Sequence, residues 1–291
     1  MKLANHWSVD RLSSNKKNIK RIFFYRICGT GMSSGAVLLK DMGYEIEGAD
    51  SVFAPPVGPY LKQSGIPCHE LATTSDELMK GFDLIVVGNV VPREGEFGGR
   101  RVEDLGIPFC SLADVLGGLC LSEQNVIGVA GTHGKTTTTY ILTQLLEKLG
   151  KKPGYLIGGV MEERPSARLG DGSYFIIESD EYDSAYFQKI SKFRMYCIDH
   201  LILTSLEFDH GDIFNSIDDI TDQFKAILNE VSGNFILCSD YDEIVKLGEG
   251  IKNKTYYGLD STDGPSNITM SPEGSEFNLQ YKNEELTFKT S

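Results

Sequence analysis

The segment from Asn125 to Gly150 joins an apolar run, a glycine-rich turn and a leucine repeat without interruption. NVIGVA is apolar enough for a buried strand, and TYILTQLLEKLG places its leucines at helical spacing. The turn between them, GTHGK, holds two glycines and a lysine and is followed by four threonines. A strand that enters a helix through such a turn belongs to a parallel α/β sheet and directs free backbone amides towards an anion.

The same alternation of short apolar runs and helical patterns continues through most of the chain. Strands are expected at 21–27, 45–50, 83–89 and 107–111, and in a second series at 125–131, 154–159, 173–180, 200–207 and 234–240. Helices are expected between them, for example at 31–43, 58–65 and 113–120. Almost continuously apolar strands that alternate with helices predict parallel sheets with helices on both faces, the α/β class.

The chain has 291 residues, too many for one compact α/β unit, so two domains are expected. We predict a disordered polar leader over 1–20, a Rossmann-like domain over 21–122 and a P-loop ATPase-type central domain over 123–291. From Asn253 onward, polar and apolar residues alternate around PEG and KNE turns. That pattern predicts a small antiparallel β segment.

Composition excludes several classes of partner. No apolar run is long enough to span a bilayer, and the polar, basic first residues lack the core of a secretory signal. A net charge of −13 argues against nucleic acid, which requires a basic surface. The six cysteines form no CxxC pair, and several lie in or beside apolar runs, which is typical of reduced core thiols in a cytoplasmic protein.

The glycine turn before the leucine-rich helix predicts a nucleoside triphosphate site. Lys135 would reach the β- and γ-phosphates, and the Thr136 hydroxyl would ligate Mg²⁺. Val129 occupies the first glycine position of the usual GxxxxGK[ST] pattern, so a plain turn with a surface lysine is the alternative. Four consecutive threonines have poor helix propensity, however, which favours the phosphate site. The expected ATP-binding residues are Gly131, Thr132, His133, Gly134, Lys135, Thr136 and Thr137.

A second glycine turn, ICGTGMSSGA, follows the first expected strand. Its glycines, Gly29, Gly31 and Gly35, resemble a dinucleotide fingerprint with one extra residue. Asp50 ends the next expected strand, where an acid that binds a ribose would lie. A UDP-sugar would use the same helix N-terminus as a dinucleotide, and a purely structural turn is the alternative.

Two acidic clusters end two strands of the second series. They are Glu178, Asp180, Glu181 and Asp183, and Glu207, Asp209, His210 and Asp212. The carboxyl ends of parallel strands share an edge with the phosphate turn, so both clusters should face the triphosphate. Carboxylates and a histidine there would hold Mg²⁺, whereas solvated acidic loops are the alternative.

The stretches GTHGKTTTT, IGGV, SARLG, ESDEYDSAYF and LEFDHGDIF together resemble the Mur ligases, the ATP-dependent amide-forming family of peptidoglycan synthesis. Within the family they are most similar to members that recycle peptidoglycan. Those members join UDP-N-acetylmuramate to the murein tripeptide L-alanyl-γ-D-glutamyl-meso-diaminopimelate. Members that add L-alanine more typically have EADESD and DHMD, so Tyr182 and the sequence DIF at 212–214 favour the recycling branch.

The resemblance also implies roles for single residues. Lys135, Glu178 and His210 would be catalytic, with Thr136 and Glu178 on one Mg²⁺ and His210 on a second. The UDP-sugar would be held by Gly29, Thr30, Gly31, Met32, Asp50 and Asn89, and Arg168 would approach the acceptor acid or its phosphates. The implied chemistry is attack of a carboxylate on the γ-phosphate of ATP, followed by displacement of phosphate from the acyl phosphate by the peptide amine.

Three features depart from the family pattern. Arg26 stands where members usually carry a glycine, and Lys225 lies where some members carry a carbamylated lysine, although an ordinary helix-surface lysine is the other interpretation. The family also continues past position 291 with a C-terminal domain. We therefore expect a fragment that binds its ligands without turnover. The alternatives are a UDP-N-acetylmuramate–L-alanine ligase and a simple UDP-sugar or ATP-binding module.

Overall fold

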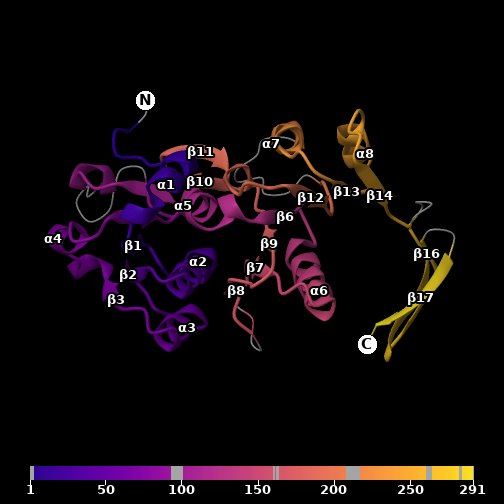
Figure 1. The fold of residues 1–291 in the computed structure, drawn as a ribbon, viewed down its shortest axis with the longest axis horizontal. Helices are drawn as coiled ribbons and strands as arrows, with labels where there is room; N and C mark the ends of the chain where they lie inside the picture. The colour runs from indigo at the N-terminus through magenta and orange to yellow at the C-terminus, as the bar shows by residue number, and fades with distance from the viewer. Residues whose placement is uncertain are drawn as a thin grey trace.

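The computed structural model describes residues 3–92, 101–159, 161, 164–207, 217–259, 264–281 and 284–290. They form an N-terminal α/β domain, a central α/β domain and a small antiparallel sheet that stands apart near the C-terminus (Figure 1). The two large sheets consist of buried, mainly parallel strands with helices packed on them. The α/β class expected from the sequence is therefore confirmed.

The N-terminal sheet has five parallel strands in the order β3-β2-β1-β4-β5. The strands are β1 (Arg21–Tyr25), β2 (Glu45–Asp50), β3 (Cys68–Glu70), β4 (Leu84–Val87) and β5 (Phe109–Ser111). The helices are α2 (Thr30–Asp41), α3 (Val57–Gln63), α4 (Asp76–Met79) and α5 (Leu112–Leu119). The direction of strand order reverses between β1 and β4, the position where open parallel sheets bind ligands. β3 was not predicted, because it has three residues and none of them is buried.

Residues 3–20 fold against this domain, so the disordered leader expected over 1–20 is wrong for the part that the structure describes. α1 (Val9–Asn15) packs on α5, where a Cβ added to Gly118 would lie 2.5 Å from the Leu12 Cβ. The Trp7 amide donates to the carbonyl of Phe109 over 2.9 Å. Leu12 and Ile19 are buried, but two such residues in a polar segment form no recognisable pattern.

The central sheet has seven strands in the order β14-β13-β12-β6-β9-β7-β8. They are β6 (Asn125–Ala130), β7 (Gly154–Leu156), β8 (Ala167–Arg168), β9 (Tyr174–Glu178), β12 (His200–Leu203), β13 (Phe235–Cys238) and β14 (Lys254–Tyr257). All neighbours are parallel except β7 and β8. The helices are α6 (Lys135–Lys148), α7 (Ile217–Glu230) and α8 (Asp242–Gly248). None of the helices in the described ranges combines the length and apolar character needed to cross a bilayer.

The end of the chain differs in part from the expected antiparallel segment. Lys254–Tyr257 extends the parallel sheet as β14, because it pairs in parallel with β13. The antiparallel sheet begins only afterwards, with β15 (Pro265–Ser271), β16 (Gly274–Tyr281) and β17 (Glu284–Thr290). In this small sheet the rings of Phe277 and Phe288 are stacked, with centroids 5.4 Å apart.

A hairpin of the central domain packs on the N-terminal domain. It consists of β10 (Asp183–Ala185) and β11 (Gln188–Ser191), which pair antiparallel. At its tip, Phe187 lies edge-on to Phe109 with ring centroids 5.0 Å apart, and the Tyr186 hydroxyl donates to Glu103. This contact brings the ends of β1 and β4 opposite the ends of β9 and the hairpin, so the two domains share a cavity.

Candidate active-site cleft

The turn between β6 and α6 forms a loop whose conformation depends on two glycines. Gly131 has φ 135° and Gly134 has φ 80°, values that side chains other than glycine rarely adopt. A Cβ on Gly131 would also lie 2.8 Å from the Ser205 amide nitrogen, so no side chain fits there. The amide of His133 donates to the Ser205 hydroxyl over 2.7 Å, which holds the loop against the end of β12. The loop therefore presents the N-terminus of a 14-residue helix, α6.

Lys135, the first residue of α6, lies folded back onto this loop. Its Nζ donates to the Gly131 carbonyl over 2.5 Å and to Glu181 Oε2 over 3.1 Å. The Glu181 side chain is fully buried, and that burial raises the pKa of its carboxyl, although Lys135 acts in the opposite direction. Glu181 belongs to the first predicted acidic cluster, but its contact with Lys135 was not foreseen.

Two oxygen donors, the Thr136 hydroxyl and the Glu178 carboxylate, lie together beside the loop. The Thr136 hydroxyl donates to Glu178 Oε1 over 2.9 Å, and Glu178 Oε2 accepts from the Gly158 amide over 2.8 Å. Neighbouring ligands of an octahedral Mg²⁺ at 2.0–2.1 Å lie about 2.9 Å from each other, so the spacing and the hard oxygen donors fit this ion. Within the described ranges, no three His, Cys, Asp or Glu side chains gather into a metal-binding cluster.

The other acidic side chains have separate partners. Asp180 pairs with Lys192 and Asp183 pairs with Lys189, each at 2.8 Å. In the second cluster, Glu207 lies beside the loop at Gly131–Gly134, which we call the phosphate loop after its predicted role; the Glu207 amide donates to the Thr132 hydroxyl over 3.2 Å. Asp209, His210 and Asp212 lie outside the described residues, so the predicted role of His210 stays a prediction.

Lys225 lies on the exposed side of α7, where it pairs with Asp222 at 3.0 Å.

The N-terminal glycine turn is held by a partly buried ion pair. Arg26 has φ 69°, a left-handed value that suits glycine, the residue that the family pattern has at this position. The Arg26 Nη1 lies 3.0 Å from Asp50 Oδ1. The Cys28 amide donates to Asp50 Oδ2 over 2.7 Å. Both oxygens of Asp50 therefore hold the turn itself. Burial, and then the Asp50 charge, raise the pKa of the Cys28 thiol to about 12.

A cavity of about 270 Å³ lies between the two domains, and we call it the interdomain cavity. It is lined by Gly29, Thr30, Gly31, Met32, Asn89, Leu112, Leu156, Gly158, Glu178, Asp180, Ser184, Lys192 and Tyr196. Five of the six residues predicted to hold a UDP-sugar are among them, and Asp50 is not. The structure thus brings the N-terminal turn and Glu178 to one cavity. Asp180 was expected at this edge as a member of the first acidic cluster, whereas Ser184, Lys192 and Tyr196 were not predicted as ligand-binding residues.

Arg168 does not line the interdomain cavity. It lies on the edge strand β8 and lines a separate hollow with Tyr140, Gln144, Tyr155, Arg164 and Pro165. The role of Arg168 at the acid or its phosphates, which the resemblance implies, stays a prediction.

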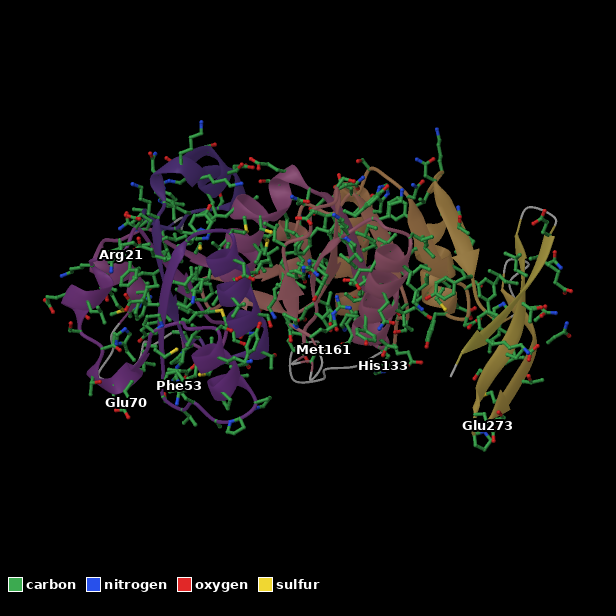
Figure 2. The ribbon with its side chains drawn as sticks, turned by 60° about the horizontal axis from the view of Figure 1, so that its bottom comes forward. Arg21, Phe53, Glu70, His133, Met161 and Glu273 are labelled. Carbon is green, nitrogen blue, oxygen red and sulfur yellow. The ribbon has the colours of Figure 1, made fainter. Side chains whose placement is uncertain are left out.

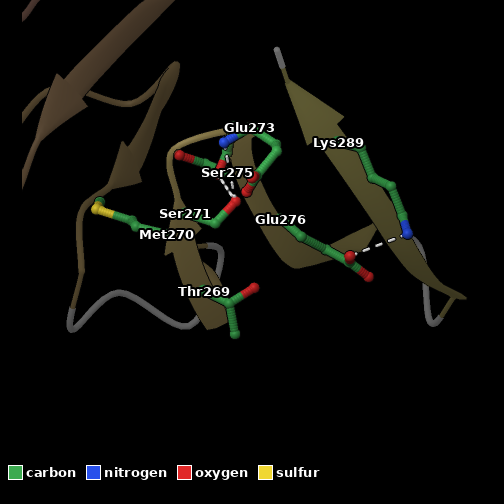
Figure 3. A pocket seen from close by; sticks show the side chains of 8 residues that line it. Thr269, Met270, Ser271, Glu273, Ser275, Glu276 and Lys289 are labelled. Carbon is green, nitrogen blue, oxygen red and sulfur yellow. Dashed lines mark hydrogen bonds and ion pairs between the residues drawn. The ribbon is translucent and has the colours of Figure 1, made fainter.

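A further hollow lies in the small sheet, between the β15–β16 turn and β17, where Lys289 pairs with Glu276 at 3.0 Å (Figure 3). It contains none of the predicted site residues. Figure 2 shows that His133 of the phosphate loop and Met161 lie in the middle of the molecule, while Glu273 marks the tip of the small sheet at one end.

The fold and the paired glycine turns are typical of nucleotide-binding α/β proteins, here with two α/β domains. Residues 21–124 match the model of the Mur ligase family, catalytic domain, and residues 129–291 match that of the Mur ligase middle domain. The chain belongs to the Mur ligase family, whose members are ATP-dependent ligases that form C–N bonds.

Relatives of this chain include two kinds of ligase. The chain is 41% identical over 214 residues to the UDP-N-acetylmuramate–L-alanyl-γ-D-glutamyl-meso-2,6-diaminoheptandioate ligase of Escherichia coli. The aligned region covers 73% of this chain and 46% of the relative. It is 33% identical over 275 residues to the UDP-N-acetylmuramate–L-alanine ligase of Dictyoglomus turgidum, covering 92% of this chain and 57% of the relative.

A crystal structure of the tripeptide-adding ligase from Neisseria meningitides superposes with a TM-score of 0.81 and 32% identity, covering 92% of this chain and 86% of that one. The chain spans about half the length of the curated relatives that it matches.

Proposed function

We propose that this chain carries the UDP-sugar and ATP sites of a ligase that joins UDP-N-acetylmuramate to L-alanyl-γ-D-glutamyl-meso-diaminopimelate. The observation that carries the proposal is the interdomain cavity, where Gly29–Met32 and Glu178 line one space. A nucleotide sugar whose diphosphate lay on Gly29–Met32 would extend its acid group towards Glu178, because β1 and β9 end on opposite walls of the cavity.

ATP would bind at the loop before α6. The backbone amides at the N-terminus of α6 and the ammonium of Lys135 suit the β- and γ-phosphates. Lys135 is already held at the loop carbonyls, so a phosphate would take it over from Glu181 and from those carbonyls. Thr136 and Glu178 would hold Mg²⁺, which when bound neutralises phosphate charge.

The ligation would proceed in two steps on these residues. The muramyl carboxylate would attack the γ-phosphorus and release ADP, and the peptide amine would then displace phosphate from the acyl phosphate and lose a proton. Lys135 would stabilise charge that develops on the transferred phosphoryl group, and the two domains would position the carboxylate for in-line attack. The use of ATP would place the reaction in the cytoplasm.

The tripeptide is favoured over L-alanine as the amine because the relative at 41% identity is a tripeptide-adding ligase, against 33% for the alanine-adding one. The choice is tested on a protein of the relatives' full length that contains this sequence. That protein should form amide product with the tripeptide much faster than with L-alanine, and the opposite preference would contradict the assignment.

The binding half of the proposal is tested on the 291-residue chain itself. Calorimetric titration should detect one equivalent of UDP-N-acetylmuramate and one of Mg-ATP. A folded chain, verified by circular dichroism, that binds neither ligand would remove the proposed function.

A further inference from the structure

The charges around the interdomain cavity are unbalanced for an anionic ligand. Among the described residues that line it, the charged side chains are Glu178, Asp180 and Lys192, and Lys192 is the one base. A nucleotide sugar that carries a carboxylate would bring a third acidic group to Glu178 and Asp180. Unless a cation lies close to that group, repulsion and lost solvation would oppose its entry.

Lys192 is positioned by its own segment. It begins a short 3₁₀ helix (Lys192–Met195), and its amide donates to the Tyr182 carbonyl over 3.0 Å. The next residue, Phe193, is fully buried in the core of the central domain. The backbone at Lys192 is therefore fixed by the acidic loop on one side and by the core on the other.

The ammonium of Lys192 is likewise held in place. Its Nζ donates to Asp180 Oδ2 over 2.8 Å, and it lies 5.7 Å from the centre of the Tyr182 ring. Asp180 is itself oriented, because its Oδ1 accepts from the Tyr182 amide over 2.8 Å. The Lys192 side chain is 15% exposed and lines the cavity. A lysine ammonium has three donors, so it can keep Asp180 and still donate to a ligand.

We propose that Lys192 binds the carboxylate of the acid substrate and holds it between the N-terminal glycine turn and Glu178. The assignment rests on the proposed function, because it takes a carboxylate-bearing nucleotide sugar as the ligand. Lys135 would then serve the triphosphate and Lys192 the acid, so two lysines on different elements would bring the two reacting groups together.

The test compares two nucleotide sugars that differ in the carboxylate. UDP-N-acetylmuramate carries a lactyl acid and UDP-N-acetylglucosamine does not. Both are titrated calorimetrically into the 291-residue chain, without nucleotide or metal, for the wild type, Lys192→Met and Lys192→Arg. Lys189→Met is the matched control, since Lys189 also pairs with an aspartate at 2.8 Å but is 70% exposed and does not line the cavity.

Lys192→Met should weaken UDP-N-acetylmuramate about tenfold or more, the usual size of a charge-assisted contact, and leave UDP-N-acetylglucosamine within about twofold. Lys192→Arg should recover most of the lost affinity, and Lys189→Met should change neither ligand. If Lys192→Met does not fold, as judged by thermal melting, Lys192→Gln provides the same comparison.

Equal weakening of both sugars by Lys192→Met would overturn the assignment, because Lys192 would then act on the shared part of the ligand or on the fold. Unchanged affinity for both would overturn it as well. A wild-type chain that binds neither sugar would instead refute the proposed function, and this assignment with it.

Discussion

The two glycine turns share a local geometry but are stabilised in different ways. Each follows a buried parallel strand and opens a helix that faces the cleft. The turn before α6 has glycines at positive φ and a lysine, Lys135, whose ammonium caps the loop carbonyls. In the turn before α2, Arg26 takes the positive φ, and its charge is neutralised by the buried Asp50. Under the proposed function, the turn before α6 thus keeps a cation for a triphosphate, whereas the turn before α2 leaves mainly backbone amides for a diphosphate.

The largest difference in stability between the two turns should appear when a glycine of each turn is replaced by alanine. Gly131→Ala places a Cβ 2.8 Å from the Ser205 amide at φ 135°, so we expect a loss of about 3 kcal/mol in the free energy of unfolding. Gly29→Ala should cost less than about 0.5 kcal/mol, because its nearest neighbour, Met32 Cγ, lies at an ordinary 3.5 Å.

Urea denaturation of both variants measures this difference. Gly150→Ala is the control for backbone strain alone, since Gly150 has φ 70° with no atom within 4 Å of a built Cβ, and about 1 kcal/mol is expected. Equal losses at Gly131 and Gly150 would mean that close packing of the loop contributes nothing.

The second prediction separates the ligands of the two turns. Lys135→Ala should weaken Mg-ATP binding about 100-fold, because it removes charge-assisted contacts to the phosphates, while UDP-N-acetylmuramate binds as before. Calorimetry with each ligand gives the two affinities. A parallel loss of both would show that Lys135 organises the whole cleft.

A third prediction concerns strain at Arg26. Arg26→Ala and Arg26→Gly both remove the ion pair with Asp50, but only glycine also relieves the φ of 69°. We expect the glycine variant to be more stable than the alanine variant by about 1.5 kcal/mol in urea denaturation. Equal stability would indicate that the backbone relaxes once the arginine is removed.

The smallest expected effect is the pH dependence contributed by Cys28. Its pKa is about 12 in the fold and 9.0 ordinarily, so the unfolded chain loses the proton first as the pH rises. The stability contribution of this half-buried thiol is thus fully present below pH 9 and is lost as the pH rises towards 12. Because Cys28 is partly exposed, we expect the free energy of unfolding to fall by about 1 kcal/mol by pH 10.5. Cys28→Ser should have a flatter stability profile over this range, and an unchanged profile would contradict the shift.

Local sequence patterns predicted most of the strands well, because strands such as β1 and β4 are almost continuous apolar runs bounded by turn residues. β1, β2, β4 and β5 were all expected, and so were β6, β9, β12 and β13. Short edge strands such as β3 and β8 were missed, because two or three half-polar residues carry no periodicity. The helix in the expected leader was missed for a related reason, since Leu12 is the one buried residue of α1.

The site was only partly predictable from the sequence. Motifs indicate the chemistry of nearby residues, but they do not show which distant residues the fold brings to the same cavity. Thr136 and Glu178 were expected beside the same loop, and the structure brings them into contact. Lys192 could not be identified from the sequence as a cavity residue. Its position depends on the fold of the β10–β11 hairpin, which it follows, and on the burial of Phe193 in the core. The resemblance implied that Arg168 approaches the acid; Arg168 lies on the edge strand β8 and lines another hollow, and its role stays a prediction.

The central claim is that a nucleotide sugar lies across the interdomain cavity with its acid directed at the phosphate loop. A crystal structure of the chain with UDP-N-acetylmuramate and a non-hydrolysable Mg-ATP analogue tests it most directly. The account predicts the diphosphate on the amides of Gly29–Met32, the carboxylate at Lys192 and the γ-phosphate at Lys135. Electron density for the sugar in the hollow lined by Arg164 and Arg168, with the interdomain cavity empty, would contradict it.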